Sequence, residues 1–265
     1  MCFNVVIVNP RKKDVRVPVF NLLDYMNVNR DGFSIYTVKD GKEMVYRTLD
    51  SKKFIEFIKT NVSYNELTHM HFRLASSGSI MLKNVHMWRI EDESYDGKYY
   101  YVSHNGMVSK YANYTHLYPN HAYWRKKIER EINENTESDT LAFIRSEDFY
   151  NAIFYDITQL ENVLKNNGFY GAMFLTNKDE VIAISYRKPI YITLSSSLLF
   201  FSNTDIKEYV SKTKKIYGIS FKMALETVVE NAAIIYNVKN MKVRRTVKFT
   251  PPRYIYNEYL YYIDE

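Results

Sequence analysis

The sequence predicts a layered α+β protein in which two stacked sheets lie between helices. Short apolar runs typical of strands fill much of the first 106 residues and return between residues 170 and 203. Amphipathic segments with capping residues fill residues 119–165, so strands and helices are grouped along the chain. This grouping is typical of sheets that stack on each other and carry helices on their outer faces.

The first part of the chain is expected to hold five strands and one helix. Asp40-Gly41 is a turn signal between two strand-like segments and predicts a hairpin. Ser51 is expected to cap a helix over 51–62. An Asn-Gly pair, Asn105-Gly106, predicts a turn at the end of the last strand. The expected strands are 3–8, 33–38, 43–47, 67–75 and 98–106.

The rest of the chain is expected to hold helices, then strands, then two further helices and a last strand. Ser138 opens a helix with a Ser-Asp-Thr capping signature, and Gly168 ends another. The helices are expected at 120–135, 138–154, 156–168, 205–215 and 221–237, and the strands at 170–177, 181–187, 190–196, 198–203 and 242–250. A Pro-Pro pair and a tail with five tyrosines at 254–262 follow.

The composition is that of an ordinary globular protein, with 265 residues, 46% hydrophobic and 25% charged. One cysteine excludes an intrachain disulfide and a zinc site made of several cysteines. No apolar run is long enough to span a bilayer, and charge follows the first apolar run, the wrong order for a secretory signal. The sequence therefore predicts a single soluble, cytoplasmic domain over residues 1–265.

The net charge of +6 comes from short basic runs mixed with other residues, which are typical of solvated faces. Nucleic acid and membrane are therefore not predicted as partners. The 25 tyrosines, with abundant Asn, Lys and Ile, indicate an AT-rich genome such as that of a virus or phage.

Cys2 is the first candidate for chemistry. If Met1 is removed, Cys2 carries both a thiol and a free α-amine, whose reference pKa values are about 8.5 and about 7.7–8.0. The amine could then take the thiol proton, directly or through water, and so activate the nucleophile. The alternative is a small apolar residue that opens a strand.

Three further positions have a chemical and a structural interpretation. The Asn105 amide and the Gly106 N–H could donate to an oxyanion, or the pair could form a plain type I′ turn. Arg73 could bind a carboxylate in bidentate fashion, or form an internal ion pair. Asp139 could accept from an α-ammonium group, or cap a helix.

Six short motifs in one order resemble the glutaminase domain of the class II glutamine amidotransferases. The family has a terminal Cys, an Asp-Gly before an aromatic residue, a His-x-Arg-x-Ala-Thr-x-Gly stretch, an Asn-x-His, a His-Asn-Gly and a Ser-Asp-Thr. The matching stretches are MC at 1–2, NRDGFSIY at 29–36, HFRLASSG at 71–78, NVHMW at 84–88, VSHNGMV at 102–108 and SDTLAF at 138–143. The match covers about residues 1–205, and 206–265 form an extension.

The resemblance implies the four-layer αββα sandwich of the N-terminal nucleophile hydrolases, with two mainly antiparallel sheets. It implies that Cys2 attacks the side-chain amide of glutamine, releases ammonia, and leaves a γ-glutamyl thioester that water cleaves. Asn105 and Gly106 would then form the oxyanion hole. Substrate would be bound by Arg73 at the α-carboxylate and by Asp139 at the α-ammonium, with Ser76 and His86 lining the site.

The resemblance implies L-glutamine as substrate. Either a synthase partner chain accepts the ammonia, or the protein is a free glutaminase, and a homo-oligomer is the alternative to a synthase partner. No P-loop or dinucleotide fingerprint is present, so no cofactor is implied. One alternative is a zinc or iron site at His69 and His71, which share a strand face, with His86 and His104 near. The other is a catalytically silent structural or assembly protein with this fold, as in a virus or phage particle.

Overall fold

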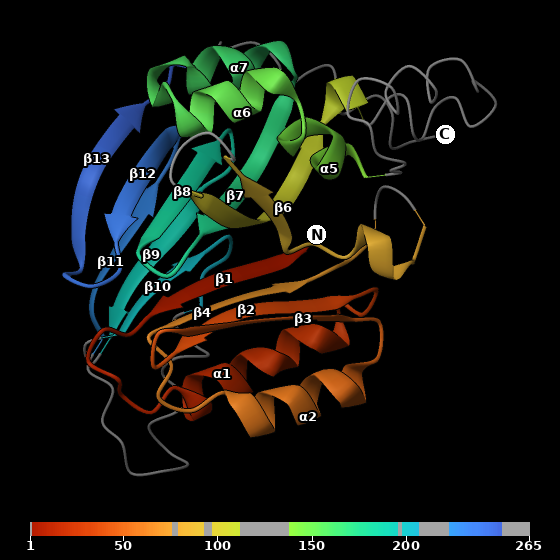
Figure 1. Cartoon of the computed structure of the whole chain (residues 1–265), viewed down its shortest axis with the longest axis vertical. Helices are drawn as coiled ribbons and strands as arrows, with labels where there is room; N and C mark the ends of the chain where they lie inside the picture. Colours follow the sequence, from red (N-terminus) through yellow and green to blue (C-terminus); the bar gives the residue numbers. More distant parts are fainter. Residues whose placement is uncertain are drawn as a thin grey trace.

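The computed structural model describes residues 2–75, 79–92, 97–111, 138–195, 198–206 and 223–250. Helices, a sheet, a second sheet and further helices follow one another through these parts (Figure 1). This arrangement confirms the predicted four-layer sandwich. Ser76, the predicted helix at 120–135, most of the predicted helix at 205–215 and the Tyr-rich tail lie outside the described residues.

The first sheet has the strand order β11-β9-β10-β1-β4-β2-β3, and every neighbouring pair is antiparallel. Its outer face is covered by α1 (Arg16–Leu22) and α2 (Ser51–Asn61), with a 3-10 turn over Leu23–Asn27 (Figure 1). The strands are β1 (Phe3–Val8), β2 (Phe33–Lys39), β3 (Lys42–Thr48), β4 (Leu67–Phe72), β9 (Ile190–Ser195), β10 (Leu198–Ser202) and β11 (Met223–Val229).

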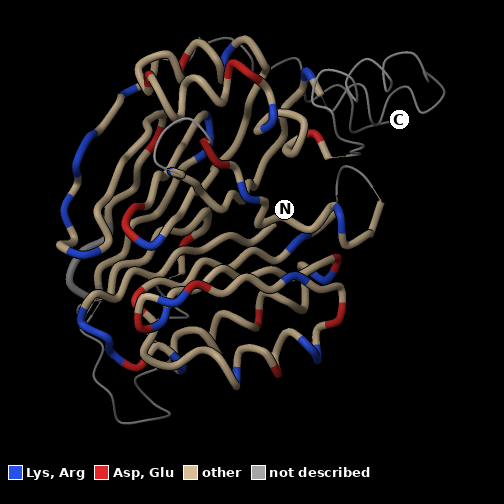
Figure 2. Tube along the Cα trace, in the orientation of Figure 1, with Lys and Arg blue, Asp and Glu red and all other residues tan. Residues whose placement is uncertain are grey.

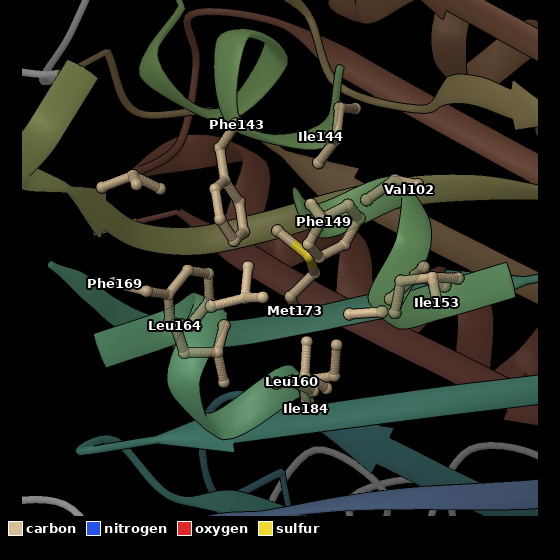
Figure 3. Packing of buried hydrophobic residues seen from close by; sticks show 14 of the residues in the cluster. Val102, Phe143, Ile144, Phe149, Ile153, Leu160, Leu164, Phe169, Met173 and Ile184 are labelled. Carbon is tan, nitrogen blue, oxygen red and sulfur yellow. The ribbon is translucent and has the colours of Figure 1, made fainter. Parts of the chain in front are cut away.

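The second sheet has the antiparallel order β13-β12-β8-β7-β6-β5. Its strands are β5 (Trp88–Glu91), β6 (Tyr99–Val108), β7 (Phe169–Thr176), β8 (Glu180–Tyr186), β12 (Ala232–Asn237) and β13 (Lys242–Lys248). The helices α5 (Asp139–Ile144), α6 (Glu147–Phe154) and α7 (Leu160–Asn166) cover its outer face, and short 3-10 turns lie over Leu82–Asn84 and Ile157–Gln159. Figure 3 shows Phe143, Phe149 and Leu164 from these helices packed against Met173 and Ile184 of the sheet.

The period-2 alternation of β1 decides what lies between the sheets. Phe3, Val5 and Ile7 pack toward the helices, whereas Val6 and Val8 join the apolar core between the two sheets. Asn4 continues that inner face, and by the same alternation so does Cys2. The inner face of β1 is therefore apolar at its end and polar at its start.

Charged side chains are absent from the central strands β1, β4, β7 and β10 and lie mainly at strand ends and on helices (Figure 2). Basic side chains lie along the edge strand β13 itself, and this strand is exposed along most of its length. Charge on an edge strand discourages pairing with another chain. Among the described helices, none is both long enough and apolar enough to cross a membrane.

Two sequence predictions are wrong because long-range pairing overrides local signals. Asn105-Gly106 forms no turn: β6 continues to Val108, and the two residues pair with Ala172 and Gly171 of β7. The predicted helix at 221–237 is replaced by β11 and β12, which pair with β9 of the first sheet and β8 of the second. The backbone between them turns at Asn231, which has a positive φ of 52°.

The cap of α2 also differs from the prediction. Asp50, not Ser51, is the N-cap, and its carboxylate accepts hydrogen bonds from the backbone N–H groups of Lys52 at 2.8 Å and Lys53 at 3.2 Å.

Removing this cap tests the assignment directly. Asp50→Ala is expected to lower the free energy of unfolding by about 1 kcal/mol, because two N–H groups of the first turn lose their acceptor. The matched variant Ser51→Ala, one residue along, should change it by less than about 0.5 kcal/mol. Urea unfolding measures both, and a larger effect at Ser51 would restore the sequence-based assignment.

Candidate active site

At the polar end of the space between the two sheets, side chains of the first sheet contact side chains of β6 in the second. Ser103 Oγ donates to Asn4 Oδ1 at 2.7 Å, and one row further along, the ring of Tyr36 stacks on Tyr101 with centroids 4.4 Å apart. Same-face side chains recur every two residues, so the next row toward the start of β1 holds Cys2 and Asn105. By this alternation, Cys2 and Asn105 belong to the inner faces of the two sheets, one step beyond the Asn4–Ser103 contact.

Cys2 is held at the start of β1 by contacts on both sides. Its Sγ lies 3.5 Å from the Leu74 carbonyl oxygen and accepts from the Leu74 N–H at 3.4 Å. Asn203 donates from Nδ2 to the Cys2 carbonyl at 3.1 Å and accepts the Asn4 N–H at 2.6 Å. Asn203 therefore fixes the backbone that carries the thiol.

The electrostatics at Cys2 oppose each other. Burial raises the pKa of the Cys2 thiol, while the hydrogen bond from Leu74, the charge of the chain's amino terminus and the charges of Arg73 and Lys188 lower it. Burial is the larger influence, so the pKa of the thiol lies above its usual value.

Asn105 and Gly106 lie within β6, not in a turn. Asn105 is 1% exposed, and its Nδ2 is buried with no hydrogen-bond partner among the described residues. An unpaired buried donor costs free energy unless a water or a ligand atom accepts its hydrogen bond. Gly106 lies so close to β7 that a Cβ would stand 1.9 Å from the Tyr170 carbonyl oxygen.

Arg73 lies just beyond β4 and is 3% exposed. Its backbone N–H donates to the Gly32 carbonyl at 2.8 Å, and its own carbonyl accepts the Asp31 N–H at 2.9 Å. Its Nη1 donates to the Ser79 carbonyl at 3.1 Å. The Asp31-Gly32 motif thus holds the backbone of Arg73, and Asp31 also accepts the Ala75 N–H at 2.8 Å.

Asp139 is not the cap of its helix. Ser138 is the N-cap of α5 and accepts from the Leu141 N–H at 3.3 Å, so the capping alternative for Asp139 is wrong. The Asp139 carboxylate instead accepts the Val108 N–H at 2.8 Å, which joins α5 to the end of β6 three residues past Asn105. Asp139 is 5% exposed.

His86 belongs to a cluster of buried imidazoles. Its ring stacks on His71 at 3.9 Å, and its Nδ1 accepts the His104 N–H at 3.1 Å. Burial lowers the pKa of His69 and of His104 to about 3, and holds those of His71 and His86 well below the usual range. The described residues contain no group of three or more His, Cys, Asp or Glu side chains suited to hold a metal ion.

Sequence reasoning did not single out Lys188 or Asn203. Lys188 follows β8 and is 8% exposed, and its only sequence signal is its place between two apolar strands. Burial lowers its pKa to about 8, and the neighbouring Cys2 thiolate raises it. Asn203 follows the buried strand β10.

Comparison with known proteins gives structural matches only. No family model and no curated protein sequence matches the chain. A glutamine phosphoribosylpyrophosphate amidotransferase from B. subtilis matches over 95% of this chain and 50% of its own, with a TM-score of 0.62 at 15% identity. The chain shares the fold of class II glutamine amidotransferases.

Two further structures agree with this fold. One is described as the allosteric regulatory enzyme of purine biosynthesis, with a TM-score of 0.62, 14% identity, and coverage of 95% of this chain and 50% of that one. The other is a glutamine aminotransferase class-II domain protein from Silicibacter pomeroyi, with a TM-score of 0.51, 10% identity, and coverage of 95% and 100%. The chain thus spans about half the length of the first two amidotransferase-fold proteins.

Proposed function

We propose that this chain hydrolyses the side-chain amide of glutamine through Cys2 and releases ammonia. The observation that carries the proposal is the buried amide of Asn105, which has no hydrogen-bond partner among the described residues and lies, by strand alternation, on the sheet face opposite that of Cys2. Attack of a thiolate on an amide carbon creates an oxyanion, and donors aimed at that oxygen lower the barrier. The shared fold and the order of the sequence motifs support the same reaction.

The remaining site residues take the roles that the resemblance implies. The backbone N–H of Gly106 is the second oxyanion donor. Arg73 binds the α-carboxylate of glutamine and Asp139 its α-ammonium, and both are buried close to the ends of β4 and β6. His86 lines the site, as does Ser76, which lies outside the described residues. The chain acts as a single cytoplasmic domain, alone or as a homo-oligomer, and the ammonia passes to a partner synthase chain or is released.

The proposal is tested by measuring ammonia release from glutamine together with the intact mass of the protein. We expect release by the wild type after Met1 removal, and a loss of at least about a thousandfold in Cys2→Ala, because the nucleophile is gone. Ammonia release that persists in Cys2→Ala would contradict the nucleophile. A processed, folded wild type that releases none would favour the structural alternative.

Substrate binding has its own test at Arg73. Arg73→Lys keeps the charge but loses the bidentate geometry, so KM for glutamine is expected to rise about tenfold while kcat changes little. Steady-state kinetics measure both constants. The exposed Arg245 of β13 supplies the control, since Arg245→Lys should leave KM unchanged. An unaltered KM in Arg73→Lys would exclude Arg73 from carboxylate binding.

A further inference from the structure

One side chain, that of Asn203, continues the first sheet beyond the point where β1 and β10 stop pairing. The last pair of this ladder joins Val5 to Ser202. One residue further, the Asn203 N–H donates to the Asn4 carbonyl at 3.2 Å, and Asn203 Oδ1 accepts the Asn4 N–H at 2.6 Å. Asn203 Nδ2 then donates to the Cys2 carbonyl at 3.1 Å. The side-chain amide thus takes the place of a backbone partner and extends the hydrogen bonding to Cys2.

Cys2 and its neighbour Asn4 are held from three directions. On the β4 side, Cys2 Sγ accepts the Leu74 N–H at 3.4 Å. Across the space between the sheets, Ser103 Oγ of β6 donates to Asn4 Oδ1 at 2.7 Å. On the β10 side, Asn203 holds the backbone of both residues. The start of β1 is therefore fixed relative to β4, to β10 and to the strand that carries Asn105.

These contacts matter most when Cys2 is the first residue of the chain, as the proposed reaction requires. The ends of a chain are poorly ordered unless contacts tie them down. The Cα of Cys2 carries the carbonyl, the side chain and the α-amine, so hydrogen bonds to the carbonyl and to the sulfur together restrict where the amine lies. Asn203 is 8% exposed, so little water competes for its hydrogen bonds.

We propose that Asn203 is a positioning residue for the reaction at Cys2. Its amide holds the Cys2 carbonyl, and through it the α-amine and the thiol, in the orientation from which the amine takes the thiol proton and the sulfur attacks the substrate amide. A displacement of about 1 Å at a reacting group can lower a rate about a hundredfold. Asn203 acts through Cys2 and not on the substrate itself. The inference rests on the proposed glutaminase function and deepens it.

Replacing Asn203 with aspartate removes the donor and keeps the acceptor. In Asn203→Asp, one oxygen can still accept the Asn4 N–H, whereas the other replaces the amide nitrogen and repels the Cys2 carbonyl. We expect kcat for ammonia release to fall about 10- to 100-fold, because the nucleophile is misplaced. KM for glutamine should change less than about twofold, because Arg73 and Asp139 are not altered.

Asn9→Asp is the matched control, because Asn9 is a buried asparagine that holds backbone at the opposite end of β1. Its Nδ2 donates to the carbonyls of Lys13 at 2.7 Å and Asn65 at 2.9 Å, and its Oδ1 accepts the Lys13 N–H at 2.8 Å. The substitution removes the same kind of donor from the same strand. It should lower the free energy of unfolding but leave kcat and KM unchanged. An equal fall of kcat in Asn9→Asp would show that lost stability, rather than the position of Cys2, lowers the rate.

Nuclear magnetic resonance tests the contact without turnover. Cys2 is the sole cysteine, so protein labelled with ¹³C-carbonyl cysteine and ¹⁵N-phenylalanine gives one carbonyl correlation, from Cys2 to the Phe3 amide. Loss of the hydrogen bond should move this carbonyl resonance upfield in Asn203→Asp, whereas Asn9→Asp should leave it in place. If Asn203→Asp does not fold by circular dichroism, Asn203→Gln replaces it in both assays. The longer side chain displaces the amide by one methylene, and the same results are expected.

The outcomes separate this inference from the proposed function. Ammonia release that depends on Cys2, together with an unchanged kcat in Asn203→Asp, would overturn the positioning role and keep the glutaminase. A raised KM at unchanged kcat would overturn it as well. A wild type that releases no ammonia would overturn the glutaminase, and the carbonyl resonance would then still decide the contact: a shift in Asn203→Asp supports it, and an unmoved resonance excludes it.

Discussion

Replacing Gly106 with alanine is expected to lower the free energy of unfolding by at least about 3 kcal/mol and to abolish ammonia release. The added Cβ would lie 1.9 Å from the Tyr170 carbonyl oxygen and 2.6 Å from the Gly171 Cα. Both are backbone atoms of β7, so no side-chain rotation can relieve the clash, and β6 and β7 must separate. Urea unfolding and the ammonia assay measure the two effects.

Gly41→Ala is the matched control for this substitution. Gly41 has a φ of +73°, but an added Cβ would meet no atom within 4 Å. Only the backbone strain remains, and about 1 kcal/mol is expected. Equal effects at the two glycines would show that close approach of β6 and β7 is not what requires Gly106.

Acidification below pH 6.5 is expected to destabilise the protein steeply. His69, His71, His86 and His104 are all buried, and burial lowers the pKa of each below its usual value, to about 3 for His69 and His104. The four imidazoles therefore bind protons near pH 6.5 in the unfolded chain, but remain neutral at that pH in the native state. Their contribution to stability is complete above pH 6.5 and is lost as the pH falls toward 3.

The expected size is about 2 kcal/mol for each of His69 and His104 between pH 7 and pH 5, from about 1.4 kcal/mol per pH unit per proton. His71 and His86, whose pKa values burial also lowers, act in the same direction. Urea midpoints between pH 7.5 and 5 test this, and ¹⁵N spectra of the imidazoles should show these rings neutral in the native state at pH 5. Constant midpoints over this range, or protonated rings in folded protein, would contradict the prediction.

Between pH 7 and pH 5, the effect of histidine protonation on stability can be distinguished from that of carboxylate protonation. Hydrogen bonds and ion pairs lower the pKa values of Asp14, Asp40 and Asp156 below the usual 3.8, so these groups keep their charge at pH 5. Loss of stability above pH 5 therefore reports on the buried imidazoles rather than on these acids.

Local sequence signals determined most of the strands and the main helices that the structure describes. The apolar run at 3–8 and the Asp40-Gly41 turn became β1 and the hairpin of β2 and β3, because few other conformations suit such residues. The order of six short motifs indicated an amidotransferase-like glutaminase with Cys2, Asn105 and Arg73 as candidates. These are properties of residue type and spacing, which the linear chain carries.

The tertiary structure decided what depends on partners far away in the chain. Asn105-Gly106 is a turn signal by itself, but β7 offers a paired edge with a facing glycine, so the strand continues. Residues 223–237 have helical periodicity, but β9 and β8 present edges whose backbone groups pair with β11 and β12. Hydrogen bonds to an open sheet edge outweigh a weak local preference.

The arrangement of the site residues also depends on contacts between segments that are far apart in the chain. The sequence by itself determined that a cysteine, an arginine and an asparagine of the right type are present in the right order. Only long-range packing put Cys2 and Asn105 on facing sheets, joined Asn203 to the backbone of Cys2 through the pairing of β1 with β10, and buried Lys188 and four imidazoles. Burial and proximity arise from the packing of distant segments, and they set the pKa values on which the proposed chemistry depends.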